Sequence, residues 1–460
     1  MHETIAWLTD ATGRVADALW SSPLTLAALL LTGLYLTLRL RLVQVRGFRH
    51  AIALVTGRYS SHRDVGEVSH FQALSTALSA TVGTGNIAGV ATAIAFGGPG
   101  ALFWMWVTAA IGMATKFAEC SLALRFREVA PDGEIAGGPM YTLARGAGMP
   151  RLAKAFALFA MITALGIGNM VQANSVVDGL AYVAPALKGH GGAVGLVLAA
   201  LVGLVILGGV RRIARVASML VPFMAVLYLA GAIIVLANHA AEIPAALATI
   251  VQHALNPWAV GGAAVGEAIR WGVARGLFSN EAGLGSSPMA HAAARTNEPV
   301  REGLVAMMEP FIDTLVICTM TGLAIVVTGA WQTPDESLKG AALTAHAFTL
   351  VLGPAGGWIV GLGLVLFAYS TTIAWSYYGD RAARFLLGPA AVMPYRVVYT
   401  LVVIVGASVP LRLVWNLADI TNIFMAAPNL ISLWLLSGLV VRMKEDYFSR
   451  PQRPRTSEET

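Results

Sequence analysis

Charged residues are scarce in this chain. Only 12% of its 460 residues are Asp, Glu, Lys or Arg, 57% are hydrophobic, and the mean hydropathy is +0.68. A soluble domain carries about 25% charged residues, so the polar side chains here are too few to cover a soluble globule. Apolar runs near the roughly 20 residues that a helix needs to cross a bilayer recur along the chain, without the short alternating segments of a membrane β-barrel. The composition therefore predicts an all-α polytopic membrane protein.

Cysteines are rare and catalytic motifs are missing. Cys120 and Cys318 fall far apart inside predicted spans, which indicates neither a disulfide framework nor a zinc site. The sequence contains no HExxH motif, G-x-S-x-G elbow or Walker motif, so we do not expect an enzyme. Basic loops at a membrane explain the formal charge of +6 better than nucleic-acid binding does. The first ten residues, MHETIAWLTD, carry no Lys or Arg, unlike the start of a cleavable signal peptide.

Eleven apolar segments are predicted to cross the membrane. Lys and Arg concentrate in the segments that lie inside if the N-terminus is outside, since the outside segments then hold only Arg14, Lys188, Lys339 and Arg412. The positive-inside rule therefore predicts a multi-pass protein of the cytoplasmic (inner) membrane, with its N-terminus outside and its C-terminus in the cytoplasm. The expected spans are residues 22–40, 71–98, 101–124, 155–183, 192–209, 216–237, 260–292, 304–329, 354–378, 394–410 and 416–441.

Apart from the first span, the spans divide into two sets of five. Because each set holds an odd number of spans, the second set must cross the membrane in the opposite direction to the first. Inverted repeats of this kind are common among secondary transporters, whose site lies between the repeats at the membrane midplane. The predicted organisation is an outside N-terminal segment with an extra helix and a basic cytoplasmic loop (1–70), two five-helix repeats (71–255 and 256–441) and a cytoplasmic tail (442–460).

The first helix of each repeat contains a stretch rich in glycine and polar residues: TVGTGNIAGV at 81–90 and ARGLFSNEAGLGSSP at 274–288. Unsatisfied backbone groups in hydrocarbon are costly, so such a break persists where it lines a cavity or binds something. Freed N–H groups suit a carboxylate, and freed carbonyls suit a cation such as Na+. The alternatives are close helix packing by the glycines and a dinucleotide loop. The latter lacks the strand and the acidic residue that it requires.

Further polar residues lie inside predicted spans. Ser370, Thr371 and Thr372 offer hydroxyl oxygens suited to an alkali ion, although such hydroxyls also bond back to their own helix. Gln172 is suited either to a ligand or to a neighbouring helix. Glu309 and Asp313 lie four residues apart, and two like charges there require a cation, a proton or a nearby arginine. Three further sets of charged residues inside spans are expected to pair with each other: Lys116–Glu119, Glu267–Arg270 and Arg275–Glu281.

Two long motifs carry a resemblance to a known family. GGPGALFWMWVTAAIG at 97–112 and RGLFSNEAGLGSSPMAHAAA at 275–294 resemble the signatures of the sodium:alanine symporter family, also called the alanine or glycine:cation symporters. The resemblance implies a LeuT-like 5+5 inverted repeat with one extra N-terminal helix and a broken first helix in each repeat. It also implies Na+- or H+-coupled import of small neutral amino acids, with no organic cofactor, and we expect Na+ to be the coupled ion. The alternative is a proton-coupled permease of the same fold, in which Glu281 is the titratable group near the breaks.

The resemblance also assigns roles to individual residues. Asn86 and the backbone of the first break would meet the substrate carboxylate, and Phe278 and Trp375 would limit the side-chain volume that the pocket accepts. The sodium site would consist of Ser370 and Thr371 with the carbonyls of Ser79, Val82 and Phe367. The substrate-binding residues would be Thr81, Gly83, Thr84, Gly85, Asn86, Gln172, Phe278, Ser279, Asn280, Gly283, Thr371 and Trp375. The resemblance leaves the oligomeric state open.

Overall fold

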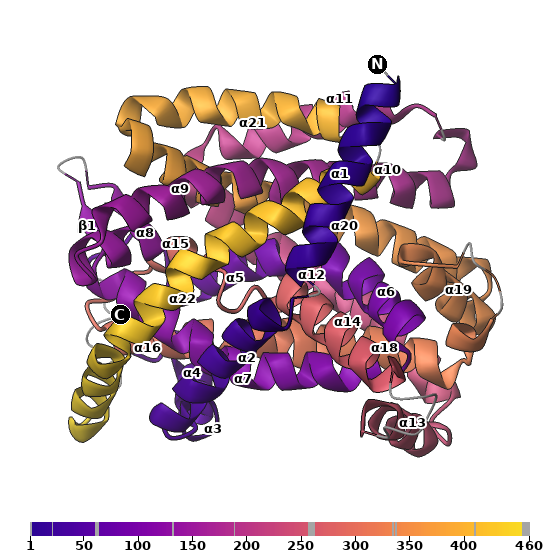
Figure 1. Ribbon diagram of the computed structural model, residues 1–460, viewed down its shortest axis with the longest axis horizontal. Coiled ribbons are helices and arrows are strands. Elements are labelled where there is room, and N and C mark those ends of the chain that lie inside the picture. Colours follow the sequence, from indigo (N-terminus) through magenta and orange to yellow (C-terminus); the bar gives the residue numbers. More distant parts are fainter. Residues whose placement is uncertain are drawn as a thin grey trace.

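The computed structural model describes residues 2–20, 22–59, 64–130, 133–187, 189–255, 263–333, 335, 338–408 and 411–452. These residues form helices, apart from their connections and one antiparallel pair of short strands, in which Glu128 pairs with Ala136. Figure 1 shows α7, α9 and α21 running roughly along the long axis of the molecule. The strand β1, the helix α8 and the C-terminal end of α22 lie at the left in that view, and α13 and α19 lie at the right.

The described elements fall on either side of the gap at residues 256–262. Before it are α1 (His2–Trp20), α2 (Pro23–Arg39), α3 (Val43–Arg46), α4 (Phe48–Val55), α5 (His70–Thr81), the π-helical turn η1 (Gly85–Gly89), α6 (Val90–Gly97), α7 (Gly100–Arg125), β1 (Glu128–Val129), β2 (Ile135–Ala136), α8 (Pro139–Tyr141), η2 (Thr142–Gly146), α9 (Pro150–Leu165), η3 (Gly166–Met170), α10 (Val171–Val183), η4 (Pro185–Leu187), α11 (Gly191–Ile206), α12 (Gly209–Asn238) and α13 (Ile243–Leu255). After it are α14 (Ala263–Asn280), α15 (Pro288–His291), α16 (Pro299–Ala306), α17 (Met308–Pro310), η5 (Phe311–Cys318), α18 (Thr319–Val327), η6 (Ala330–Gln332), α19 (Ala341–Leu352), α20 (Pro354–Leu387), η7 (Pro389–Ala391), α21 (Val392–Gly406) and α22 (Leu411–Ser449).

Seven helical segments among the described residues are long and apolar enough to cross a membrane, and nine if each of two bent pairs counts as one span. The bent pairs are α1 with α2, which meet at 42°, and α5 with the helical segment after it, which meet at 52°. Two expected spans do not meet these criteria, because α11 has only 16 residues and α14 carries Glu267, Arg270 and Arg275. The all-α polytopic class is confirmed, and eleven crossings stay a prediction.

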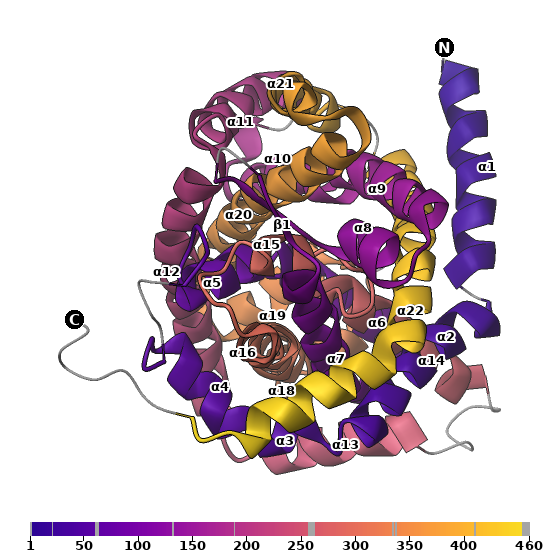
Figure 2. The same ribbon diagram turned by 90° about the vertical axis from the view of Figure 1, so that its left-hand side faces the viewer.

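The apolar pattern predicts the span at 22–40, which coincides with α2, and the structure adds α1 before it. Figure 2 shows α1 at the edge of the molecule. Its buried Trp20 donates from Nε1 to the carbonyl of Asp419 in α22 over 3.3 Å. Near its middle, the amide of Asn416 donates to the carbonyl of Thr9 over 2.9 Å. The helix therefore packs on α22 with one face, and Asp10 and Arg14 remain exposed on another.

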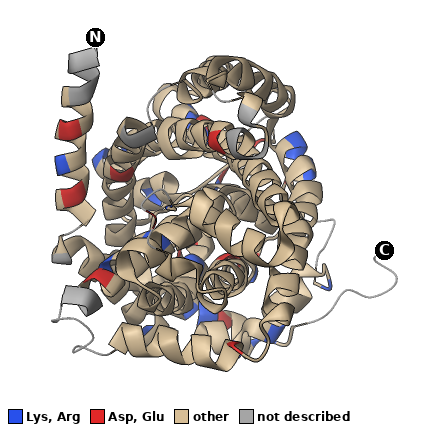
Figure 3. Cartoon of the chain, turned by 90° about the vertical axis from the view of Figure 1, so that its right-hand side faces the viewer, with Lys and Arg blue, Asp and Glu red and all other residues tan. Residues whose placement is uncertain are grey.

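Small residues let the central helices approach closely. Figure 3 shows that charged residues occupy few positions on the helices facing the viewer. At the contact of α14 with α7, a methyl group on Gly276 would overlap the hydroxyl of Thr108, and one on Gly272 would overlap the carbonyl of Ala101. Glycine at these positions permits the close backbone approach that holds helices together in a membrane. This packing fixes α14 against α7 and thereby positions the second break.

Candidate functional site

The first break interrupts the helix that begins at His70. A capping box formed by Ser69 and Gln72 starts α5. The helix ends at Thr81, and Val82 adopts an extended conformation with ψ 91°. The side chain of Asn86 then folds back, so that its Oδ1 accepts the N–H of Gly83 at 2.9 Å. The break predicted from the sequence is confirmed, and Asn86 satisfies one of the amide groups that it frees.

The second break begins where α14 ends at Asn280. Glu281, Gly283 and Gly285 follow with φ of 54°, 90° and 81°, a left-handed region that glycine adopts without strain. The carboxylate of Glu119 in α7 accepts the N–H of Gly283 at 2.7 Å and that of Gly285 at 3.1 Å. Helical structure resumes at α15. The predicted second break is therefore also present, and a carboxylate from another helix holds its freed amides.

The residues predicted to form the sodium site lie together between α5 and α20. The hydroxyl of Ser79 donates to the carbonyl of Ser370 at 2.8 Å. The hydroxyl of Ser370 lies 2.8 Å from the carbonyl of Phe367 and 3.3 Å from that of Ser79, and the Thr371 hydroxyl lies 3.4 Å from the carbonyl of Val82. We call these five residues the Ser370–Thr371 cluster. It gathers hydroxyl and carbonyl oxygens, the hard ligands that an alkali ion requires.

Thr372, the residue after Thr371, shows the alternative predicted for these hydroxyls, which is a hydrogen bond back to its own helix. The hydroxyl of Thr372 donates to the carbonyl of Ala368 at 2.9 Å, one turn earlier in α20. Ser370 and Thr371 differ from Thr372 because their hydroxyls also reach carbonyls of another segment, that of Ser79 in α5 and that of Val82 where α5 ends. Three consecutive hydroxyl residues thus separate into two that face the end of α5 and one that faces its own helix.

A small cavity lies between the two breaks, next to the Ser370–Thr371 cluster. Its volume is about 10 Å³, close to the room for a single water molecule. Eight of the twelve predicted substrate-binding residues line this central cavity. The complete lining is Ala80, Thr81, Gly83, Thr84, Gly85, Ile167, Gln172, Phe278, Glu281, Leu284, Thr371, Trp375 and Asn422.

The other four predicted substrate-binding residues do not line the cavity. Gly283 donates to Glu119, and Asn280 accepts from the N–H of Ala282 through its own Oδ1 at 3.1 Å. Asn86 and Ser279 both face the buried carboxylate of Asp313. Its Oδ1 accepts from Asn86 Nδ2 at 2.6 Å and its Oδ2 accepts from the Ser279 hydroxyl at 2.7 Å. In this conformation these side chains therefore hold the two breaks together instead of facing a ligand.

Several polar atoms of the central cavity have no partner. The hydroxyl of Thr84, the Oε1 of Gln172 and both amide atoms of Asn422 are buried without a hydrogen bond. A buried polar group left unsatisfied costs about 1–3 kcal/mol, so three such groups around one cavity indicate a place for a polar ligand. Asn422, Ile167 and Leu284 also line the cavity and were not predicted from the sequence. An asparagine inside the last apolar span was the available signal for Asn422.

A larger cavity of about 530 Å³ lies beyond the central one. This vestibule is lined by residues of α1, α6, α10, α14, α19, α20 and α22, among them Asp17, Asp178, Arg270, Arg275, Lys339, Trp415 and Asp419. The rings of Phe278 and Trp415 lie 4.9 Å apart, and Phe278 lines the central cavity whereas Trp415 lines the vestibule. The guanidinium of Arg275 lies 5.3–5.7 Å from the rings of Trp271, Phe278 and Trp415. These aromatic rings and Arg275 separate the two cavities.

Of the three ion pairs expected inside spans, one forms and the other two predictions are wrong. Glu267 and Arg270 do pair, at 3.6 Å. The Nζ of Lys116 instead lies 3.1 Å from Glu309, because Glu119 is engaged by backbone amides of the second break. Arg275 faces aromatic rings, so it does not pair with Glu281 as expected.

A chain of buried polar groups runs away from Glu309. Both ring nitrogens of His291 face carboxylates, Nδ1 at 2.5 Å from Glu302 and Nε2 at 2.7 Å from Glu309. Glu302 also lies 2.5 Å from Nδ1 of His70, at the start of α5. Glu309 further accepts from Ser287 at 2.7 Å. The chain compensates both glutamates and ties α5, α7 and α15 to the segment from α16 to α17.

Two backbone segments close the end of the molecule opposite the vestibule. Residues 64–69, before α5, lie against residues 292–297, after α15. The N–H of Glu67 donates to the carbonyl of Ala293 and that of Arg295 donates to the carbonyl of Val68, both at 2.8 Å. We call the guanidinium that fastens the two segments the Arg127 clamp: it donates to the carbonyls of Val65, Ala292, Ala294 and Thr296 at 2.8–2.9 Å.

The clamp lies outside the membrane-spanning helices, two residues beyond the end of α7. Burial lowers the pKa of Arg127 from its ordinary value, and the charges of Glu302 and Asp64 oppose that effect. Because an ordinary arginine pKa lies far above neutral pH, the guanidinium keeps its charge. Each of its four hydrogen bonds is therefore charge-assisted.

Comparison with known proteins covers almost the whole chain. The sequence pattern of the sodium:alanine symporter family matches residues 5–460. The sodium/alanine symporter AgcS of Methanococcus maripaludis is 50% identical over 427 residues, which are 91% of this chain and 93% of that protein. The probable sodium/glutamine symporter GlnT of Bacillus subtilis is 38% identical over 444 residues, covering 96% and 91%. The putative sodium/proton-dependent alanine carrier YrbD of the same organism is 36% identical over 458 residues, covering 96% and 92%.

These matches confirm the resemblance that the two sequence motifs carry. They cover both helix breaks and the Ser370–Thr371 cluster. The family consists of membrane symporters and not of enzymes, in agreement with the missing catalytic motifs. The chain belongs to the sodium:alanine symporter family.

Proposed function

We propose that this protein imports a small neutral amino acid, alanine or glycine, together with Na+ by alternating access. The observation that carries the proposal is the central cavity, where the unpartnered polar atoms of Thr84, Gln172 and Asn422 converge between two broken helices. A zwitterion supplies both hydrogen-bond donors and acceptors to such a cavity. The sodium/alanine symporter from Methanococcus maripaludis supports alanine as the first substrate to test.

The walls of the cavity favour a small side chain. Phe278, Leu284 and Trp375 leave about 10 Å³ in this conformation, so an amino acid must displace some of the wall residues to enter. Trp375 cannot retreat from the cavity, because a methyl group on Gly168 would already overlap its indole ring. Larger amino acids would require a displacement that close packing resists. We therefore expect alanine and glycine to be accepted and branched or aromatic amino acids to be excluded.

The Ser370–Thr371 cluster is the proposed sodium site. Its hydroxyl and carbonyl oxygens come from both α5 and α20, so an ion bound there draws the first break against α20. Thr371 also lines the central cavity, which places the ion beside the substrate. Sodium and substrate then raise each other's affinity by the same factor, as thermodynamic linkage requires.

The proposed membrane arrangement is the inverted repeat of residues 71–255 and 256–441, with the N-terminus outside. The two breaks lie in the first helix of each proposed repeat, as this arrangement requires. The start of the second repeat, residues 256–262, the end of the tail, residues 453–460, and Lys188 lie outside the described residues. In this arrangement the vestibule opens to the outside, and the Arg127 clamp closes the cytoplasmic side.

Uptake into proteoliposomes tests the proposal. Labelled alanine is offered with an inward Na+ gradient or an equal K+ gradient, at matched pH and membrane potential. Concentrative uptake only with Na+ is the expected result. The alternative is proton coupling, which the buried carboxylate of Glu281 in the cavity favours. Uptake that follows an imposed proton gradient without Na+ would replace the sodium proposal by this alternative.

A further inference from the structure

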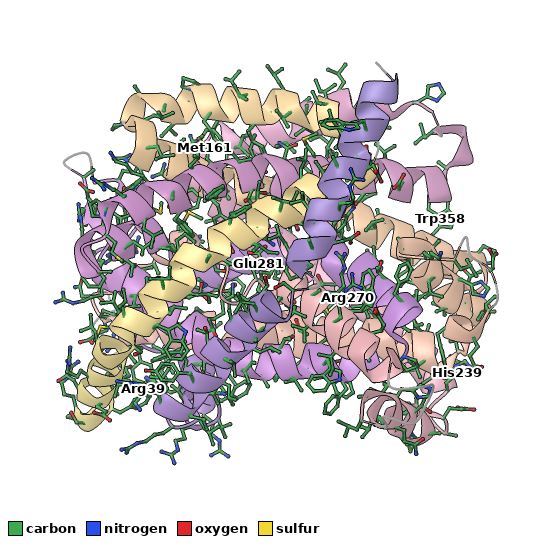
Figure 4. All side chains as sticks on the ribbon, viewed as in Figure 1. Arg39, Met161, His239, Arg270, Glu281 and Trp358 are labelled. Atoms are coloured by element: carbon green, nitrogen blue, oxygen red, sulfur yellow. The ribbon has the colours of Figure 1, made fainter. Side chains whose placement is uncertain are left out.

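Glu281 occupies an unusual position in the second break. It is a non-glycine residue with φ 54°, and it directs its carboxylate into the core of the protein, where only 4% of the residue is exposed. Figure 4 shows Glu281 near the centre of the molecule, with Arg39 and His239 near its periphery. Its Oε1 accepts the indole N–H of Trp375 at 3.1 Å, and its Oε2 accepts from the hydroxyl of Ser286. Both partners are neutral.

The other buried carboxylates of the described residues differ from Glu281 in their partners or in their position. Neither Glu119 nor Asp313, which accept hydrogen bonds from neutral groups, lines the central cavity. The remaining three have basic partners: Glu302 with His70 and His291, Glu309 with Lys116 and His291, and Asp380 with Arg381 and Arg396. Glu281 is therefore the one buried carboxylate in the described part of the chain that faces the cavity without an ion-pair partner.

An ionised carboxylate can accept about four hydrogen bonds, and Glu281 accepts two. A buried charge needs compensation, which a bound cation can supply. We propose that Glu281 binds the ammonium group of the transported amino acid. This inference rests on the proposed function and names the residue that requires the substrate to be an amine.

The cavity atoms without a hydrogen-bond partner include both acceptors and donors, as binding of a zwitterion requires. Gln172 Oε1 is an acceptor only, so it suits the ammonium group beside Glu281. The hydroxyl of Thr84 and the Nδ2 of Asn422 can donate, so they suit the substrate carboxylate. A cavity with separate donor and acceptor groups orients a zwitterion in one direction.

The charges of the loaded site also balance. Glu281 contributes one negative charge, the amino acid contributes one positive and one negative charge, and one Na+ at the Ser370–Thr371 cluster contributes a positive charge. The complete site is neutral, whereas a site that holds the amino acid without Na+, or Na+ with an acid that has no ammonium group, carries an uncompensated charge in a low-dielectric interior. Among the states that hold a substrate, the fully loaded one is therefore that in which the two breaks can close around the ligands at least cost.

Glu281→Gln tests the inference with little change of shape. The glutamine keeps an oxygen for Trp375 and a polar partner for Ser286, but it removes the charge. Alanine and lactate, which carries a hydroxyl in place of the ammonium group, are compared as competitors of labelled glycine uptake in proteoliposomes. In the unmodified protein we expect alanine to compete at least about 100-fold better than lactate, since a site built for a polar group rejects an analogue without it. In E281Q the half-saturating alanine concentration should rise at least about 30-fold, and the preference over lactate should fall below about tenfold.

Two variants control for folding and charge. Glu281→Asp keeps the carboxylate and should retain the preference for alanine over lactate even if its affinity falls. Glu267→Gln removes a half-exposed glutamate from α14, the helix that precedes Glu281, and should behave like the unmodified protein. Thermal unfolding confirms that each variant is folded. If E281Q loses all glycine uptake, direct binding of labelled alanine and lactate to the purified variant measures the same preference.

The outcomes separate the inference from the proposed function. A folded E281Q whose half-saturating alanine concentration stays within threefold of the unmodified value overturns the inference. An E281Q variant that loses only the pH dependence of uptake also overturns the inference, because Glu281 would then carry a proton instead of binding the ammonium group. Failure of the unmodified protein to take up any amino acid overturns the proposed function and the inference with it.

Discussion

The Arg127 clamp should hold the end of the protein opposite the vestibule closed, and Arg127→Lys should loosen it. The guanidinium makes four charge-assisted hydrogen bonds at 2.8–2.9 Å to two separate backbone segments. Lysine keeps the charge, but its single nitrogen cannot span four carbonyls in a planar fork. Losing two hydrogen bonds to a charged group, at a net value of about 1.5–3 kcal/mol each, favours separation of the segments by about 3–6 kcal/mol. This corresponds to a rise of roughly 100- to 20,000-fold in the population of the separated state.

Hydrogen–deuterium exchange measures that population directly. The amides of Glu67, Val68, Arg295 and Thr296 donate across the two segments, so they exchange only when the segments separate. Peptides that cover residues 64–69 and 292–297 should exchange about 100-fold faster or more in R127K than in the unmodified protein. Peptides from the middle of α7 should not change, because the clamp lies beyond that helix.

Arg145→Lys is the matched control. Arg145 pairs with Glu128 at 2.7 Å, but both side chains are nearly half exposed, and exposed pairs contribute little. Its exchange pattern should match that of the unmodified protein. Unchanged exchange of both peptides in a folded R127K protein would refute the idea that the clamp holds the two segments together. Equal acceleration of exchange in R145K would show that the effect comes from the loss of any arginine and not from the clamp.

Three further predictions concern the ion, the substrate and the segment between α2 and α5. Thr371→Ala should raise the half-saturating Na+ concentration of uptake about tenfold, whereas Thr372→Ala, whose hydroxyl bonds its own helix, should leave it unchanged; equal effects would contradict the sodium assignment. Leu284→Ala should enlarge the central cavity and allow valine to compete with alanine, and continued exclusion of valine would show that other walls set the limit. Burial, and then the charge of Arg301, lower the pKa of His50, so the folded protein favours its neutral form. The contribution of His50 to the free energy of unfolding should therefore be full above about pH 6.5 and be lost as the pH falls through the pKa of the folded state. Thermal unfolding at pH 7.5 and pH 5 should show a smaller loss in His50→Gln, and an equal loss would rule out His50 as a source of the pH dependence.

The sequence predicts both helix breaks because their signals are local. Glycines and polar residues inside an apolar run cannot continue a membrane helix without a compensating reason, and the chain breaks at Val82 and after Asn280. The Ser370–Thr371 cluster was reachable from a resemblance that extends over the whole chain. The structure adds that Thr372, the third hydroxyl, faces its own helix.

The partners of buried charges were not predictable from spacing along one helix. Lys116 and Glu119 lie one turn apart in α7, yet Lys116 pairs with Glu309 and Glu119 holds the amides of the second break. These partners come from segments more than 160 residues away in the sequence. Only the packing of α14 and the segment from α16 to α17 against α7 brings them together.

The sequence by itself determined the membrane class of this protein, its membership in a symporter family and the two places where its helices break, because hydropathy and glycine content act locally. The tertiary structure decided which side chains face the cavity between the breaks. Asn86 and Ser279 turn to Asp313, whereas Glu281 and Asn422 enter the cavity wall. That choice depends on the backbone angles at each break and on the rotation of each helix against its neighbours, which no single segment encodes.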